Sequence, residues 1–254
     1  MTVGQYGQTG LWYADYFERE VYNTYGDVIS LISKAKRIFK FGRSPSAGTA
    51  ISTVWSQGGN EVYLTDNTIT KVTSTVASTT TIGVEGHTVD GNGDFTFVVQ
   101  TVTLNGTADV ALTTPLARCS RLYNSGSVAL TGIVSAATAA DVVYCEIPTG
   151  NQQSFKCATT ISKDDYYALN GFQLGVTKKT AATAEFALEV REKGGVFRPR
   201  DLMVAASPGG SITDSWEPWI IVPPNSDIRV RVVASANSTP VAASFEGILA
   251  SIIS

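Results

Sequence analysis

The residues that could perform acid–base chemistry begin with His87, the only histidine in the 254-residue chain. An imidazole titrates near neutral pH and would be the base of a Ser-His-Asp triad. His87 lies in the turn-like stretch GVEGHTVDGNG, however, and the chain contains no GxSxG motif to supply a nucleophile. Paired carboxylates such as Asp164 with Asp165, or Glu189 with Glu192, could serve a glycosidase, but such adjacent charges usually lie on a solvated turn or edge. We therefore predict no catalytic residues and no enzymatic activity.

Metal binding is suggested only by the segment DGNGDF, which places Asp90, Asn92 and Asp94 at the alternating spacing that begins a calcium loop. The second half of such a loop does not match. An EF-hand requires glycine at its sixth position and glutamate at its twelfth, where this chain has Phe95 and Thr101. Asp, Asn and Gly also tolerate the backbone of a tight turn. The sequence therefore predicts a tight loop between two strands, with weak calcium binding as the alternative, and no metal site is assigned.

Other features of the sequence exclude several classes of protein. The three cysteines are widely spaced with no CxxC pair, so we expect buried or partly buried free thiols at Cys119, Cys145 and Cys157. The segment GRSPSAGTA lacks the GK[ST] ending of a phosphate-binding loop, and no cofactor is predicted. A net charge of −3 provides no basic field for specific nucleic-acid binding. The N-terminus does not resemble a secretory signal, and no apolar run of about 18 residues is present to span a membrane.

The elements that would position these residues begin with a helix. From Leu11 to Phe41, apolar residues recur every three or four positions, as on one face of a helix. Acidic residues near its start and basic residues near its end complement the helix dipole, and Gly26 with Asp27 could divide it in two. This aromatic-rich face either packs on the protein's own β domain or docks onto another subunit, because interfaces are enriched in tyrosine and tryptophan.

After residue 45 the pattern changes to the period of two that is typical of half-buried strands. Asn105-Gly106 separates two alternating runs, which predicts a type I′ hairpin between antiparallel strands. Many short strands with Gly, Pro and Asn turns predict a mainly β protein, built as an antiparallel β-sandwich or jelly roll with an N-terminal amphipathic helical arm. The expected units are a helical arm and basic joint at residues 1–45, a first β module with the hairpin at 46–115, and a jelly-roll-like C-terminal sandwich at 116–254.

Four ordered segments in the first half of the chain carry a resemblance to a known family. They are Lys40 to Arg43 (KFGR), Val54 to Gly59 (VWSQGG), Thr101 to Gly106 (TVTLNG), and the strand Arg118 to Asn124. In this order they resemble virion structural proteins encoded by tailed bacteriophages, notably the short-tailed phages and their marine relatives. The resemblance covers roughly residues 37–130. The chain departs from the family in its DGNGD loop, which is richer in glycine and aspartate, so loop-level functions are not carried over.

The resemblance implies a non-enzymatic virion protein that is assembled in the host bacterial cytoplasm as a homo-oligomer and that contacts other tail, neck, fibre or capsid proteins. A tail or neck component, as a ring or a fibre attachment, is the first expectation, and a capsid decoration protein is the alternative. A receptor-binding or carbohydrate-binding β-sandwich is an alternative of another class, for which two tryptophans would have to stack on sugar rings. The residues expected at an assembly interface are Trp12, Tyr16, Phe17, Tyr25, Ile32, Phe39, Arg43, Trp55, Trp216 and Trp219.

Overall fold

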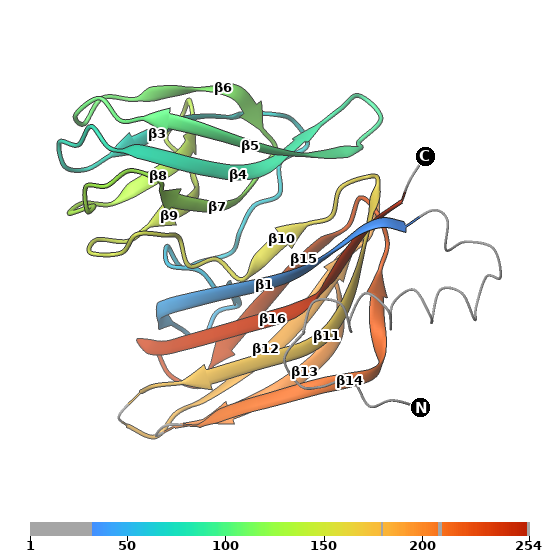
Figure 1. Cartoon of the computed structure of the whole chain (residues 1–254). Helices are drawn as coiled ribbons and strands as arrows, with labels where there is room; N and C mark the ends of the chain where they lie inside the picture. The colour runs from blue at the N-terminus through green and yellow to red at the C-terminus, as the bar shows by residue number, and fades with distance from the viewer. Residues whose placement is uncertain (1–31, 179, 208–209, 253–254) are drawn as a thin grey trace, which may run out of the picture.

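The computed structural model describes residues 32–178, 180–207 and 210–252. In these ranges every helix or strand assigned is a strand, and the strands pair antiparallel. They form two sandwiches that lie one above the other in Figure 1. The prediction of a mainly β, antiparallel sandwich protein is therefore confirmed for the part of the chain that the structure describes.

The larger sandwich, lower in Figure 1, is called here the body sandwich. One of its sheets has the order β1-β16-β11-β14, and the other has the order β10-β15-β12-β13 with β2 paired to β15. Its core contains large side chains that are fully buried, among them Tyr167, Phe172, Phe186 and Phe245. Its strands are β1 (Ile32–Ala47), β2 (Ser52–Thr53), β10 (Ala158–Thr160), β11 (Asp165–Val176), β12 (Thr183–Arg191), β13 (Arg198–Ala206), β14 (Ser211–Val222), β15 (Asp227–Ala234) and β16 (Thr239–Ile252).

The smaller sandwich, upper in Figure 1, is inserted in the chain between β2 and β10 and is called the inserted sandwich. Its sheets have the orders β6-β3-β8-β9 and β5-β4-β7. Ile69, Ile82, Leu116, Leu122 and Ile147 are fully buried in a second core of its own. Its strands are β3 (Ile69–Ser74), β4 (Thr81–Val89), β5 (Phe95–Thr103), β6 (Val110–Leu116), β7 (Arg118–Asn124), β8 (Val134–Thr138) and β9 (Val143–Ile147).

The predicted helix is wrong from Ile32 onward, because these residues form β1, which pairs with β16 over most of its length. The sequence KRIFKFGR also alternates with a period of two, and Phe39 and Phe41 lie on the same exposed face. The distant strand β16 supplies the hydrogen-bonding partner that a local helix would have supplied to itself, so tertiary pairing overrides the helical periodicity. Residues 11–31 of the predicted helix lie outside the described residues.

A turn occurs at Asn105-Gly106, with Ala108 N–H donating to Asn105 O at 3.0 Å, but the predicted type I′ turn is wrong, because only Gly106 of the two residues has a positive φ, and the predicted hairpin is wrong as well. Gly106 has a φ of 65°, and its N–H donates to Ser78 O at 2.9 Å. β5 pairs with β4, whereas β6 pairs with β3 in the opposite sheet, so this turn carries the chain across the inserted sandwich. The predicted boundary between residues 115 and 116 also falls inside β6, and Leu116 is part of the same core as β7. The structure instead divides the chain on either side of the insertion.

Candidate functional site

A cleft of about 850 Å³ separates the two sandwiches along the first half of β1. One side is formed by residues 36–41 of β1 and by residues 159–162, which include the end of β10 and the loop after it. The other side is formed by residues of β4, β5 and β7, strands of the inserted sandwich that face β1 and β10 in Figure 1. The insertion therefore brings segments that are distant in the sequence to one concave surface.

The cleft exposes aromatic and aliphatic side chains. Phe39 and Phe41 of β1 are 56% and 38% exposed, and Phe97 and Val99 of β5 are 46% and 55% exposed. The ring of Phe41 meets Phe155 edge-on, with 5.7 Å between the ring centroids. Large apolar side chains that are gathered in a concave surface are typical of a contact site for another molecule.

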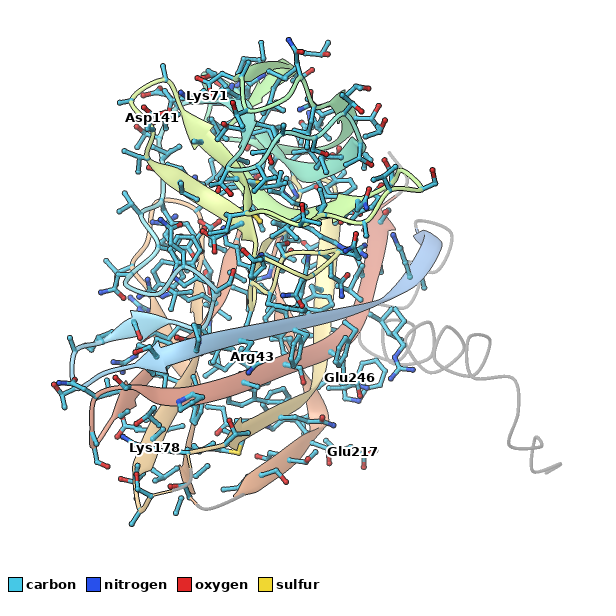
Figure 2. The ribbon with its side chains drawn as sticks, turned by 90° about the vertical axis from the view of Figure 1, so that its left-hand side faces the viewer. Arg43, Lys71, Asp141, Lys178, Glu217 and Glu246 are labelled. Carbon is cyan, nitrogen blue, oxygen red and sulfur yellow. The ribbon has the colours of Figure 1, made fainter. Side chains whose placement is uncertain are left out.

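Basic side chains outnumber acidic ones along the cleft. Three of the cations are paired with carboxylates: Arg37 pairs with Glu246 of β16, Arg121 Nη1 lies 3.4 Å from Glu85 Oε1, and Lys156 pairs with Glu61. Glu246 is labelled in Figure 2, on β16 beside β1. Among the charged side chains that line the cleft, Lys36, Lys40 and Asp165 have no ion-pair partner in the described ranges.

Lys36 and Lys40 make no ion pair with any other residue in the described ranges. Lys36 is exposed, and Lys40 is partly buried within the cleft. Burial lowers the pKa of Lys40, and the neighbouring Glu85 offsets only part of this effect. An ammonium group that has lost hydration without gaining a direct partner is stabilised by an incoming anion.

His87 reaches the edge of the cleft, but it is 3% exposed. Its ring lies between Phe95 and Phe97, with centroid separations of 6.4 and 5.3 Å. Burial lowers the pKa of His87 to about 3, assisted by the charge of Lys40. The imidazole is therefore neutral near pH 7 and far less basic than an efficient general base at that pH.

The sandwiches are joined beside the cleft by a buried ion cluster centred on Asp227 of β15. Arg118 of β7 donates from Nε to Asp227 Oδ1 at 3.0 Å and from Nη2 to Oδ2 at 3.3 Å. Thr160 donates to the same carboxylate at 2.7 Å, and Arg191 of β12 donates to it from Nε at 3.2 Å. Asp227 is 2% exposed and Arg118 is 6% exposed, so a bidentate pair in low-dielectric surroundings crosses the interface.

A second buried ion pair lies between Lys156 and Glu61, with 2.6 Å between Nζ and Oε1. The same ammonium group donates to the backbone oxygens of Cys119 and Tyr144 at 2.8 and 2.9 Å, so it uses all three of its protons. Trp55 packs against it, with Nζ 5.5 Å from the ring centroid. This arrangement ties the segments that enter and leave the insertion to the strands of the inserted sandwich.

The DGNGDF loop also joins the two sandwiches. Asp90 Oδ1 accepts the backbone N–H groups of Asn92 and Asp94, both at 2.9 Å, so the predicted tight loop is confirmed. The Asp94 carboxylate pairs with Lys193 and accepts from Asn225 Nδ2 at 2.8 Å. These carboxylates are engaged by protein donors, and no group of three or more His, Cys, Asp or Glu side chains suited to a metal ion occurs in residues 32–178, 180–207 and 210–252.

The residues predicted for an assembly interface fall into several places. Trp12, Tyr16, Phe17 and Tyr25 lie outside the described residues, and Ile32 is the first residue of β1. Phe39 lines the cleft, and Arg43 is exposed farther along the same strand, where Figure 2 labels it. Trp55 is 5% exposed and donates its indole N–H to Gly59 O at 3.0 Å, so its ring contacts the protein's own interior.

The two C-terminal tryptophans of that prediction lie on β14, at the edge of the body sandwich. Trp216 is partly buried and packs against the body core, and Trp219 is partly buried against Ala168 and Ala250. Sequence reasoning missed the buried ion cluster and the lysines of the cleft. A weak signal was present in DIRVRVV, where the period of two places Asp227 on the same strand face as Arg229 and Arg231.

The free cysteines were predicted correctly, because Cys119, Cys145 and Cys157 are all buried and unpaired. Burial raises the pKa of the Cys157 thiol well above its usual value, so this thiol stays protonated near pH 7. In the described part of the chain, no helix is long and apolar enough to cross a membrane.

Comparison with known proteins assigns no family. No family model and no curated protein matches the chain. Among solved structures, the VP2 subviral particle protein of infectious bursal disease virus is 10% identical, with a TM-score of 0.22, and the match covers 89% of this chain and 73% of that one. The PBSX exported protein XepA is 12% identical, with a TM-score of 0.18 and 85% of each chain covered.

An isomalto-dextranase of Arthrobacter globiformis T6, solved with panose, is also similar at 10% identity and a TM-score of 0.21, with 83% of this chain and 36% of that chain covered. At these TM-scores, none of the three likenesses carries an argument about function.

Proposed function

We propose that this chain is a non-enzymatic structural protein of a bacteriophage virion, which assembles as repeated copies in the tail or neck as a ring or fibre-attachment component. The ordered segments KFGR, VWSQGG, TVTLNG and RCSRLYN support the proposal through their resemblance to virion proteins of tailed bacteriophages. A capsid decoration protein is the alternative location. The partners would be further copies of this chain and neighbouring virion proteins.

One observation carries this proposal: several residues that bear the resemblance hold the segments that enter and leave the inserted sandwich. Gly42 of KFGR lies so close to Cys157 and Val54 that a Cβ would stand 2.3 Å from Cys157 N and 2.4 Å from Val54 O. Trp55 of VWSQGG packs on the buried Lys156. Arg118, the first residue of RCSRLYN, pairs with the carboxylate of Asp227 at the start of β15. The shared segments therefore include residues with packing and ion-pair roles in the frame of the molecule, which supports a structural function.

The outer surface of the body sandwich supports assembly. β13 and β14 are the last strands of their sheets, so each has one edge without a strand partner in the described residues. They expose Leu202 and Val204 on β13, at 54% and 56%, and Ile212 and Ile221 on β14, at 37% and 54%. Long edge strands with exposed apolar side chains are normally covered in a soluble protein. A neighbouring copy or virion protein would provide that cover.

The proposal is tested by quantitative mass spectrometry of virions purified from the phage that encodes this chain. We expect the protein to be present at a defined copy number well below that of the major capsid protein. A copy number comparable to that of the capsid protein would support the decoration alternative instead. Absence of the protein from the purified virions would overturn the virion assignment altogether.

Assembly itself is tested by sedimentation velocity on the purified full-length chain. We expect an oligomer, which the double substitution Leu202→Glu with Ile221→Glu on the exposed faces of β13 and β14 would weaken. Val128→Glu, at a position of the inserted sandwich that is 63% exposed, is the control for added negative charge. A monomer at all concentrations would contradict assembly of this chain with itself.

Any truncation used to probe the N-terminal segment has to stop at residue 31. Removal of residues 1–42 would take away most of β1, which pairs with β16 from Ile32 to Ala47. Such a variant would lose an edge of the body sandwich together with the segment, and its behaviour would report on folding and not on assembly. A chain that begins at Ile32 keeps every strand that the structure describes.

A further inference from the structure

The cleft between the sandwiches has an open strand edge in addition to its aromatic and basic side chains. β1 is the outermost strand of its sheet and pairs only with β16 in the described residues. The backbone carbonyl of Ile38 accepts from Tyr167 Oη at 3.1 Å, and that of Lys40 lies 3.9 Å from Cys157 Sγ. Residues 36–41 of β1 border the cleft. At about 3.3 Å per residue, six residues offer roughly 20 Å of contact to an extended or helical segment.

The side chains restrict the chemistry of what would fill the cleft. Phe39, Phe41 and Phe97 require an apolar or aromatic surface to cover them. Lys36 and Lys40 favour carboxylates, because neither has an ion-pair partner in the described ranges. A basic segment, or a nucleic-acid base without its phosphate, would leave the two ammonium groups without counter-ions. The matching occupant is an acidic segment that is rich in aromatic residues.

Such a segment exists in this chain, directly before β1. Residues 1–31 contain four carboxylates, one arginine and no lysine. They also contain seven aromatic side chains, of which five fall in the stretch WYADYFEREVY together with three of the carboxylates. This stretch is complementary in both charge and apolar character to the lysines and phenylalanines of the cleft.

We propose that the cleft between the two sandwiches binds the acidic, aromatic N-terminal segment, residues 1–31, of a second copy of this chain. Carboxylates of WYADYFERE pair with Lys36 and Lys40, and its aromatic rings cover Phe39 and Phe97. Each copy then donates a segment to one neighbour and receives one from another, which is the head-to-tail arrangement that closes into rings. This inference rests on the proposed function, since it identifies the contact through which copies assemble.

The test is photo-crosslinking in the full-length chain, with p-benzoylphenylalanine in place of Phe97. Equal amounts of isotopically light and heavy chains are mixed, irradiated and digested, and crosslinked peptides are identified by mass spectrometry. We expect crosslinks from position 97 to residues 1–31, with mixed light–heavy pairs that show a second copy as the donor. The same photo-crosslinker at Val128, which is 63% exposed outside the cleft, is the matched control and should give no crosslink to residues 1–31.

A charge exchange provides the second arm of the test. Lys36→Glu combined with Lys40→Gln in the receiving chain is expected to lower the yield of mixed crosslinks by about tenfold, since two ion pairs are lost. A donating chain with Asp15→Lys and Glu18→Lys should restore the yield with this receiver and lower it with the unchanged one. Unchanged circular dichroism of each variant shows that the sandwiches remain folded. Rescue of this kind requires direct contact and would not follow from a general loss of stability.

Three outcomes would overturn the inference: no crosslink from position 97 to residues 1–31, crosslinks only within one copy, or crosslinks to a different surface of the second copy. These failures are separable from failure of the proposed function. If the protein is present in virions and oligomeric but the crosslinks are absent, copies assemble by another contact, such as the exposed faces of β13 and β14. If the crosslinks form but virions lack the protein, the segment exchange holds and the virion assignment fails.

Discussion

Removal of the charge of Asp227 is predicted to destabilise the whole molecule, because this carboxylate balances two guanidinium groups at the interface between the sandwiches. Asp227→Asn keeps the size of the side chain and its contact with Thr160 but removes the counter-charge of Arg118 and Arg191. Arg118 is 6% exposed, so it cannot recover hydration without movement of β7. A single uncompensated charge of this kind costs about 3–5 kcal/mol. We expect Asp227→Asn to lower the free energy of unfolding by an amount in that range.

The pH dependence of stability follows from the same geometry. Burial by itself would raise the pKa of Asp227, but the guanidinium groups of Arg118 and Arg191 lower it below its ordinary value. A carboxylate with a lowered pKa in the folded state stabilises the protein above the pKa of an unfolded aspartate, which is about 3.9. That stability is lost as the pH falls below about 4. The wild type should therefore lose stability in acid more steeply than Asp227→Asn does.

The assay is urea denaturation followed by tryptophan fluorescence and circular dichroism at pH 7 and at lower pH. Glu192→Gln is the matched control, because Glu192 pairs with Arg200 on the surface, with 56% of its side chain exposed. Loss of that pair should change the free energy of unfolding by no more than about 1 kcal/mol. If Asp227→Asn were no more destabilising than Glu192→Gln, the claim that this ion cluster joins the two sandwiches would be refuted.

Three further predictions use the same assay. Lys156→Met should lower the free energy of unfolding by about 3–5 kcal/mol by leaving Glu61 buried and charged, and the double variant Lys156→Met with Glu61→Met should recover much of that loss; an additive double variant would contradict the pairing. His87→Gln should flatten the pH dependence of stability between about pH 6.5 and pH 4, since the unfolded imidazole takes up a proton that the buried one, with a pKa of about 3, does not. Phe186→Ala, at a fully buried position, should cost about 3–5 kcal/mol, and a smaller loss would mean that the body core is loosely packed.

The alternation of apolar and polar residues was readable from the sequence because it is a local property. DIRVRVV buries Ile228, Val230 and Val232, as a period of two requires. Turns were readable for the same reason. Asn225 has a φ of 57° and Gly106 a φ of 65°, conformations that asparagine and glycine tolerate. The pairing of the strands on either side of a turn was not readable from the sequence. β5 and β6, for example, are consecutive in the chain but belong to different sheets.

The candidate cleft could be anticipated only in fragments. Phe39 and Trp55 were singled out as aromatic residues near the joint, yet one is exposed in the cleft and the other is buried. Nothing in their local sequence distinguishes them. Their exposure depends on where the inserted sandwich comes to rest, which is set by contacts such as that of Arg118 with Asp227, 109 positions apart.

For the part of the chain that the structure describes, the sequence alone was enough to predict that its elements are strands, where several turns lie, and that the three thiols are free. Each of these properties depends on residue type and on periods of a few residues. Tertiary structure decided that residues 32–47 are a strand and not a helix, because their partner β16 lies about two hundred positions away. It also decided which charges are buried in pairs and which lysines remain without a partner in the cleft. Such pairings depend on distant segments meeting at a defined register, and no local pattern encodes that meeting.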